Sequence, residues 1–522
     1  MAKPQNGSTE MESFLPQDNS NSNGVTKYKI SSKGDVEAAA NHAGFDPFKA
    51  RQLAHPVSNC DTLTHLLKAS LGTGILSMPA AFKASGLSMG IFLTIFVSLI
   101  CTHCAYVLVT SAHELYKKTR KTQMGFADVA EQACLTGPQW GRKFAPFARN
   151  LIRFGLFVTY FMTCSCYTVI MAKNFNYVVN HHLGYDVEIR ITIAIMMVPL
   201  ILLAYVPNLK YLAPFSMVAN GFMAVGLGIT FYYLVINLKP VSEVAMIADV
   251  GTMPVFLSIT IFAIEAIGVI MPLENNMGTP QSFIGLCGVL NQGMSGVTLV
   301  YILIGFFGYL AFGDQVEGSV TLNLPKEAIA AQLVNVLVGG AVFCTFGLQF
   351  YVCIDIAWNA IKDRYAKSEK VANYIMRTVM TFVCVVLAIA VPTIIPFVSL
   401  IGAFCFSILG LAAPILIEML TFWEKGFGKY NWKIVKNLIV FIVAILALIF
   451  GSKAAIEDII DMYSSKKLEP ILLGNGTTHG NNTVNGTLSE VLTNVTSTLA
   501  STVASLKSTT SIPPTTVNST TL

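Results

Sequence analysis

The chain has 522 residues, of which 53% are hydrophobic and only 12% are charged. Soluble domains carry about 25% charged residues, so this composition excludes an ordinary soluble protein and predicts an all-α protein that crosses a membrane several times. The formal net charge of +5 gives no sign of a nucleic-acid-binding protein.

The N-terminal stretch, residues 1–55, is rich in Asn, Ser, Gly and Lys, which predicts a disordered tail. It contains no early apolar run, so a cleaved signal peptide is not expected. Residues 56–455 form the expected transmembrane domain, and residues 456–522 form a second polar tail that is rich in Thr and Ser.

Eleven apolar segments follow the N-terminal tail, each near the roughly 20 residues that a helix needs to cross a bilayer. The boundaries are weakest around Pro207 and at Pro392–Pro396, so counts of ten or twelve stay open. The segments lie at 62–83, 87–111, 147–172, 189–206, 211–237, 253–275, 283–312, 329–361, 374–391, 394–422 and 434–453.

The first segment is interrupted at its centre by the sequence LGTGI at residues 71–75. Each glycine costs a helix interior about 1 kcal/mol relative to alanine, and Pro79 follows closely. A lipid-facing helix gains nothing from such a break, whereas a helix that offers backbone N–H groups to a polar solute does. The segment also holds His65 and Lys68, which are costly at membrane depth.

The sixth segment carries a second interruption, marked by Glu265, Gly268 and Pro272. A carboxylate within an apolar span usually faces the bundle interior or a cavity. The first and sixth segments would run in opposite directions, and interrupted helices at matching positions indicate an inverted-repeat transporter. Helices 1–5 and 6–10 then form the two repeats, and helix 11 is appended.

The two interruptions together predict a binding site for a zwitterion such as an amino acid. Freed N–H groups at the start of a half-helix carry about half a positive charge and suit a carboxylate. Freed carbonyls at Phe262–Glu265 suit an ammonium group. Tyr160 either walls this site or is an ordinary packed aromatic. The predicted substrate-binding residues are Gly72, Thr73, Gly74, Tyr160, Phe262, Ala263, Glu265 and Gly268.

Two residues are candidates for proton coupling. His65 lies about two turns before Gly72 and titrates near physiological pH; the alternative is a helix-end histidine at the headgroups. Glu265 is either a proton site or a structural carboxylate that caps the broken helix. Sodium is the alternative coupling ion, because freed carbonyls and Thr73 could hold Na⁺. No organic cofactor and no bound metal are expected.

The distribution of Lys and Arg predicts the orientation in the membrane. Five lie in the loops of one side, whereas 22 lie on the other side, which places the N-terminus in the cytosol and, with an odd helix count, the C-terminus outside. The basic stretches are 27–51, 117–149, 207–210, 362–377 and 425–436.

The C-terminal tail supports this orientation through five Asn-x-Ser/Thr sites. Glycans are added only on the lumenal side, so these sites predict a glycosylated extracellular or lumenal tail. Accidental matches in a Thr-rich tail are the alternative. The five residues are Asn475, Asn481, Asn485, Asn494 and Asn518.

Three stretches resemble one known family: TLTHLLKASLGTGILSMP at 62–79, FAIEAIGVIMPLEN at 262–275 and GYLAFGD at 308–314. They are similar to the proton-coupled amino acid transporters (PAT, solute carrier family 36, within the amino acid/auxin permease superfamily). The resemblance spans roughly residues 57–455, with Ala266 where a glycine is expected. It implies a LeuT-type fold of eleven helices, a 5+5 inverted repeat plus one helix, and a proton-coupling role for His65.

The resemblance also implies a function: proton-coupled symport of small neutral amino acids across the plasma membrane or the late endosomal or lysosomal membrane. The alternatives are a sodium-coupled symporter, or an amino-acid-sensing transporter with little flux and nutrient-signalling partners at the cytosolic tail. The expected partners are therefore small neutral amino acids, the lipid bilayer and, in the sensing alternative, signalling proteins at the cytosolic tail; no nucleic acid is expected. No pore-loop repeat, Arg-rich sensor or HExxH occurs, which argues against a channel or a zinc metalloprotease.

Overall fold

The computed structural model describes residues 46–51, 53, 56–206, 209–365 and 368–472. Most of the predicted N-terminal tail and all five predicted glycosylation sites lie outside the described residues. The chain divides into two compact units between residues 459 and 460, and the described part of the second unit is residues 460–472, the end of one helix.

Every regular element in the described part of the chain is a helix. Nine of these helices are long and apolar enough to cross a membrane. Large apolar side chains such as Phe92 and Leu99 are exposed on them, at 68% and 65% of their surface, which suits lipid contact. The prediction of an all-helical, multi-pass membrane protein is therefore confirmed. The count of eleven spans is not, because the fourth segment has only 16 helical residues and the first is split into short pieces.

The helices follow the expected segments in order, as two sets of five that each open on an interrupted helix. The first set comprises α2 (Asn59–Ser70) with η2 (Thr73–Ser77) and α3 (Met78–Ser85), then α4 (Leu87–Thr119), α6 (Ala145–Leu183), α7 (Ile189–Ala204) and α8 (Leu209–Ile236). A short helix, α5 (Phe126–Thr136), separates α4 from α6. The second set comprises α9 (Met253–Ile264) with α10 (Ile267–Asn276), then α11 (Val289–Phe312), α12 (Ile329–Ile361), α13 (Glu369–Ala390), and α14 (Ile394–Leu400) with η11 (Ile401–Ala412) and α15 (Ala413–Thr421).

The last expected segment extends beyond its predicted end at residue 453. It comprises α16 (Trp432–Leu446), the π-helical turn η13 (Ala447–Gly451) and α17 (Ser452–Leu472). The tenth segment is also irregular, because η11 is a π-helix of 12 residues between two α-helical pieces. Such π-helical stretches are rare and occur mostly at functional sites.

Both predicted interruptions are present. Helix α2 ends at Ser70, where Leu71 leaves the helical region with φ −79° and ψ 59°, and η2 resumes as a 3₁₀-helix. Helix α9 ends at Ile264, and Glu265 is extended, with φ −70° and ψ 125°. The structure thus confirms that residues 71–75 and 262–268 are not continuous α-helix.

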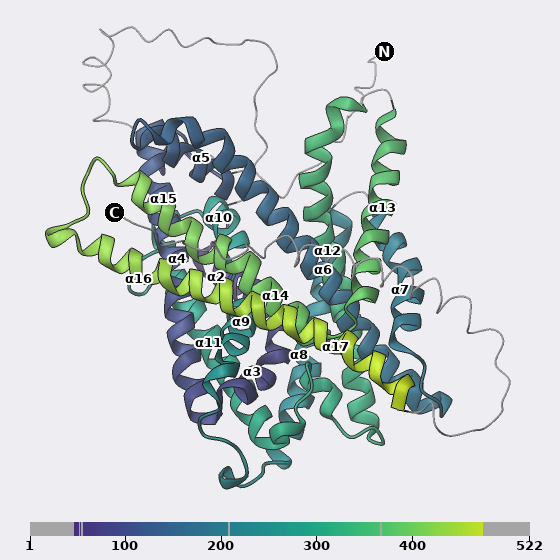
Figure 1. Cartoon of the computed structure of the whole chain (residues 1–522). Helices are drawn as coiled ribbons and strands as arrows, with labels where there is room; N and C mark the ends of the chain where they lie inside the picture. The colour runs from purple at the N-terminus through teal and green to yellow at the C-terminus, as the bar shows by residue number, and fades with distance from the viewer. Residues whose placement is uncertain (1–45, 52, 54–55, 207–208, 366–367, 473–522) are drawn as a thin grey trace, which may run out of the picture. The chain divides into compact units, whose positions relative to one another are not determined.

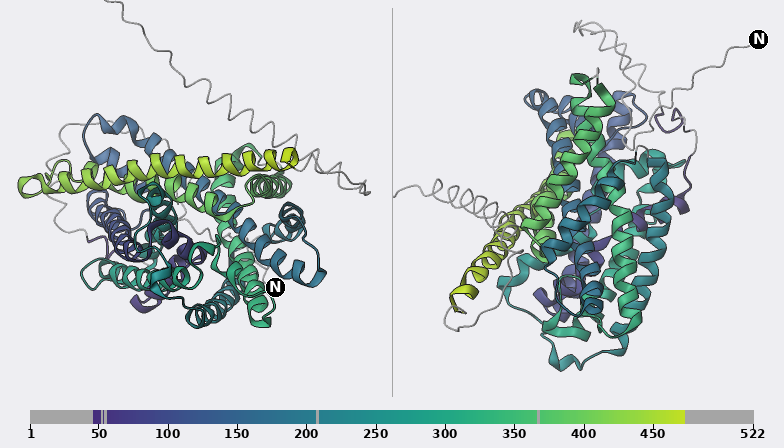
Figure 2. Two further views of the ribbon diagram at one scale, coloured as in Figure 1. Left: turned by 60° about the horizontal axis from the view of Figure 1, so that its bottom comes forward. Right: turned by 90° about the vertical axis from the view of Figure 1, so that its right-hand side faces the viewer.

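The interrupted helices lie side by side among longer ones (Figure 1). Helix α9 packs against α3, α4 and η11, α11 packs against α2, α3 and α4, and α12 packs against α6 and α8. The long helices of this unit run roughly side by side (Figure 2, right). Gly74 permits the close approach of η2 to α9, because a Cβ atom there would lie 2.6 Å from Ala263 Cα.

A buried ionic cluster holds one end of this assembly together. The Glu274 carboxylate on α10 is fully buried and accepts hydrogen bonds from the Arg51 guanidinium at 3.1 Å and the Tyr116 hydroxyl at 2.9 Å. His113 Nε2 lies 3.0 Å from the same carboxylate. The segment after Arg51 also pairs with the end of α10, where the Val57 amide donates to the carbonyl of Asn276, the last residue of that helix. The cluster therefore ties α4, α10 and the segment before α2 into one unit.

We expect Arg51→Ala to lower the free energy of unfolding by about 3 kcal/mol, because removing one partner leaves a buried carboxylate only partly compensated. Thermal unfolding of the detergent-solubilised protein measures this change. The control is Lys453→Ala, whose ion pair with Glu457 is more than half exposed on both sides and should contribute about 0.5 kcal/mol or less. Equal losses in the two variants would contradict the structural role of Arg51.

Candidate functional site

A cavity of about 90 Å³ lies between the two interruptions, α6 and η11. Because one water molecule needs roughly 10–15 Å³ of such a cavity, there is room for a solute with about six to nine groups that are each the size of a water molecule. The structure brings all eight residues predicted to bind substrate to its lining: Gly72, Thr73, Gly74, Tyr160, Phe262, Ala263, Glu265 and Gly268.

Hydrogen-bond donors face the cavity where η2 begins. The first amide groups of a helix have no intrahelical acceptor, and η2 has no side-chain cap. The hydroxyl oxygens of Ser70 and Thr73 are also buried without a hydrogen-bond partner among the described residues. Buried polar groups normally have partners, so this side of the cavity lacks an acceptor that a carboxylate would provide.

Glu265 forms the opposite part of the cavity wall and is only 8% exposed. Its Oε1 atom accepts hydrogen bonds from the Ala266 and Ile267 amides, at 3.1 Å and 2.9 Å, and so caps the start of α10. Its Oε2 atom is buried and has no hydrogen-bond partner within the described part of the chain. One carboxyl group thus performs the predicted capping through Oε1, and the Cys101 thiol of α4 lies next to the same carboxyl group.

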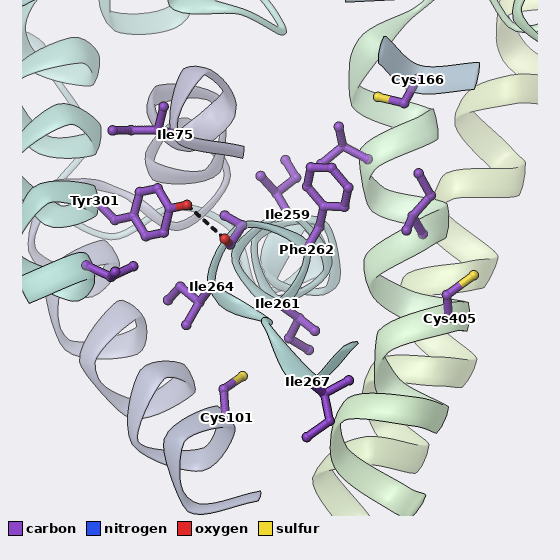
Figure 3. Close-up of a cluster of buried hydrophobic side chains, with 14 of the residues drawn as sticks. Ile75, Cys101, Cys166, Ile259, Ile261, Phe262, Ile264, Ile267, Tyr301 and Cys405 are labelled. Atoms are coloured by element: carbon purple, nitrogen blue, oxygen red, sulfur yellow. Dashed lines mark hydrogen bonds between the residues drawn. The ribbon is translucent and has the colours of Figure 1, made fainter. Parts of the chain in front are cut away.

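The carbonyl groups at the end of α9 differ from the prediction at one position. The Ala263 carbonyl, expected to face a substrate ammonium, already accepts a hydrogen bond from the Tyr301 hydroxyl at 2.8 Å (Figure 3). The Phe262 side chain points away from Tyr301, toward the helix that carries Cys405. There its ring lies 6.2 Å from the Phe406 ring, so two aromatic side chains wall that end of the cavity.

Tyr160 and Gly268 meet across the cavity. A Cβ atom at Gly268 would collide with the Tyr160 hydroxyl, so the glycine allows this tyrosine to lie against the first turn of α10. Tyr160 is therefore a wall residue as well as a packed aromatic. The sequence did not single out five further lining residues, Ser70, Thr163, Tyr167, Gln349 and Phe406, because they lie within unremarkable apolar runs.

His65 is not among the residues that line the cavity. It lies on α2, is exposed, and has no hydrogen bond or ion pair within the described residues. Lys68, one turn further on, is exposed as well. His65 precedes Gly72 by about two helical turns, as the sequence predicted. Its side chain is exposed, however, and lies outside the cavity.

Contacts from the second half of the chain hold η2 next to the cavity. The Ser77 hydroxyl donates to the Gly318 carbonyl at 2.8 Å, and η2 packs against η8 (Val320–Asn323). Ala69, in the last turn of α2, lines the cavity and is exposed, as His65 is on the same helix.

Comparison with known proteins adds independent findings. The family model described as "Transmembrane amino acid transporter protein" matches residues 55–457. The proton-coupled amino acid transporter-like protein pathetic of Drosophila melanogaster is 59% identical over 459 residues, which cover 88% of this chain and 96% of that protein. The probable amino acid transporter skat-1 of Caenorhabditis elegans is 23% identical over 414 residues, 76% of this chain and 89% of that protein. The crystal structure of MhsT in complex with L-phenylalanine aligns with a TM-score of 0.43 at 12% identity, covering 77% of this chain and 100% of that one.

The relatives are transporters and not enzymes, as the sequence predicted, and the resemblance to proton-coupled amino acid transporters is confirmed at 59% identity. The family match covers the interrupted helices and the cavity between them. This multi-pass membrane protein is therefore an amino acid transporter and belongs to the transmembrane amino acid transporter family.

Proposed function

We propose that this chain is a proton-coupled symporter of small neutral amino acids. The proposal rests on one observation: a single small cavity is lined both by the residues that begin η2 and by Glu265, whose buried carboxyl group has no cationic partner among the described residues. Donors at a helix start suit a substrate carboxylate, and a buried carboxyl group without a cationic partner suits a proton. The name of the Drosophila relative, which specifies proton coupling, supports the same assignment.

The volume of the cavity and the charge of its lining support a small neutral substrate. With room for about six to nine groups of the size of a water molecule, the cavity suits a small amino acid better than a large one. Of the described residues that line the cavity, Glu265 is the only one with a charged side chain. Leu156, Phe406 and Leu409 form an apolar part of the wall, and the polar side chains of the remaining lining are the neutral ones of Ser, Thr, Tyr and Gln.

Glu265 is our first candidate for the coupling proton, and His65 is the second. Burying a lone carboxylate is costly, and protonation of Oε2 removes that cost while Oε1 stays on the α10 amides. His65 lies on an exposed face of α2, where a histidine suits proton exchange with solvent. Rocking of the two interrupted helices with α4 and α11 against the other helices would then expose the site alternately.

The orientation and the membrane belong to the proposal as well. We place the N-terminus in the cytosol and the C-terminal tail, with its glycosylation sites, outside the cell or in the lumen. The membrane is the plasma membrane or that of late endosomes and lysosomes. Nutrient-signalling partners would meet the cytosolic tail. Sodium coupling and signalling with little flux are the alternatives that transport measurements separate from proton symport.

In proteoliposomes, an inward proton gradient should raise the initial uptake of L-alanine several-fold, with choline in place of sodium throughout. A protonophore should abolish the increase. Uptake that requires sodium at fixed pH would indicate sodium coupling instead. Specific L-alanine binding without uptake under either gradient would indicate the receptor-like alternative.

Glu265→Gln should abolish the response to the proton gradient while exchange of L-alanine across the membrane continues. The amide oxygen can still accept from the α10 amides, but it does not titrate at physiological pH. Uptake and counterflow are compared in proteoliposomes, with Glu243→Gln, an exposed loop residue, as the control. If only His65→Ala loses the gradient response, the coupling proton belongs to His65 and not to Glu265.

Gly72→Ala should weaken L-alanine binding about tenfold without lowering the melting temperature. A Cβ atom at Gly72 meets nothing within 4 Å and its φ is negative, so a methyl group fills free space in the cavity without strain. Gly221→Ala is the matched control, because a Cβ atom there also meets nothing and Gly221 lies outside the cavity. Unchanged affinity in Gly72→Ala would place the substrate elsewhere.

A further inference from the structure

The hydroxyl of Tyr301 lies where the two interrupted helices end. Tyr301 is on α11 and is fully buried. Its hydroxyl oxygen lies 2.5 Å from the Ser70 carbonyl oxygen and 2.8 Å from the Ala263 carbonyl oxygen. Ser70 is the last residue of α2, and Ala263 is the residue before the last in α9. Figure 3 shows the phenol pointing from α11 toward the end of α9.

These two carbonyl groups have lost their helical donors. The last four carbonyls of a helix have no intrahelical partner, and the end of a helix carries partial negative charge. Two such ends converge here in a membrane-embedded site, where an unsatisfied carbonyl is costly. Converging backbone carbonyls are the usual ligands of hard cations. A cation or a fixed hydrogen-bond donor is therefore required at this junction.

The Tyr301 hydroxyl meets this requirement without an ion. It offers one hydrogen to both carbonyl oxygens, and the Gly72 amide lies within reach of the same oxygen atom. The hydroxyl is fixed to α11, so it connects three segments: the end of α2, the start of the non-helical link, and the end of α9. These are the segments whose neighbouring groups line the cavity.

We propose that Tyr301 is a positioning residue for the substrate site, whose hydroxyl holds the two interruptions in register and takes the place of a bound cation. This inference deepens the proposed function and rests on it. The hydroxyl does not line the cavity itself. The hydroxyl acts through its hydrogen bonds to the Ser70 and Ala263 carbonyls. These bonds fix the position of the first amide groups of η2 relative to Glu265.

The test is L-alanine binding to the full-length, detergent-solubilised protein, with Tyr301→Phe compared to Tyr309→Phe. Tyr309 is on the same helix, is 1% exposed, and its hydroxyl accepts from the Ala245 amide at 3.3 Å, away from the cavity. Both variants lose one buried hydroxyl and keep the ring, so their melting temperatures should fall by similar amounts. The Kd for L-alanine should rise about tenfold in Tyr301→Phe and stay unchanged in Tyr309→Phe.

Three outcomes would overturn the proposal. The first is an unchanged Kd in Tyr301→Phe. The second is failure of Tyr301→Phe alone to fold, which would make the hydroxyl a requirement of the fold and not of the site. The third is wild-type binding that needs sodium instead of choline at fixed pH, because an ion would then occupy the junction. Sodium-independent binding without proton-driven uptake would leave Tyr301 in place and refute only the symport mechanism.

Discussion

The structure depends on how backbone groups are satisfied where two membrane-embedded helices are interrupted. A continuous helix satisfies its own N–H and C=O groups through internal hydrogen bonds. The core of a bilayer contains no water that could replace these bonds. At Ser70–Thr73 and Ile264–Ile267 those internal bonds are missing. Each freed group needs another partner, and the partners come from separate parts of the chain: the Glu265 side chain for the α10 amides, and Tyr301 for the carbonyls.

Three of the buried polar atoms that lack a close hydrogen-bond partner among the described residues belong to residues that line the cavity: the Ser70 and Thr73 hydroxyl oxygens and Glu265 Oε2. Other such atoms lie elsewhere, for example at Asn335 and Ser399. A folded protein rarely leaves several buried polar atoms unpaired in one place unless something else is bound there. The backbone groups at the interruptions that Glu265 and Tyr301 satisfy serve the fold. The unpaired polar atoms around the cavity are available to a solute.

The sequence allowed both interruptions and eight of the residues that line the cavity to be predicted, because glycine, proline and a lone carboxylate within an apolar run each indicate a break in the helix. Tyr301 could not be found in this way. It is one aromatic among many in an apolar helix, and its role depends on contacts with residues 38 and 231 positions away. For His65, the spacing from Gly72 gave the distance along α2. It could not show that the side chain is exposed and outside the cavity lining, because that depends on which face of α2 the neighbouring helices cover.

The position of Glu265 suggests how proton binding and helix geometry are coupled. An ionised carboxylate makes stronger hydrogen bonds to backbone amides than a neutral carboxyl group does, so protonation weakens the cap on α10. The same event removes a buried negative charge next to the substrate cavity. A proton at Oε2 would therefore loosen the hinge of the sixth helix and change the electrostatics of the site in a single step. A histidine on the exposed face of α2 has no comparable contact with either interruption, which is the physical reason why we propose the carboxyl group, and not His65, as the site of a coupling proton.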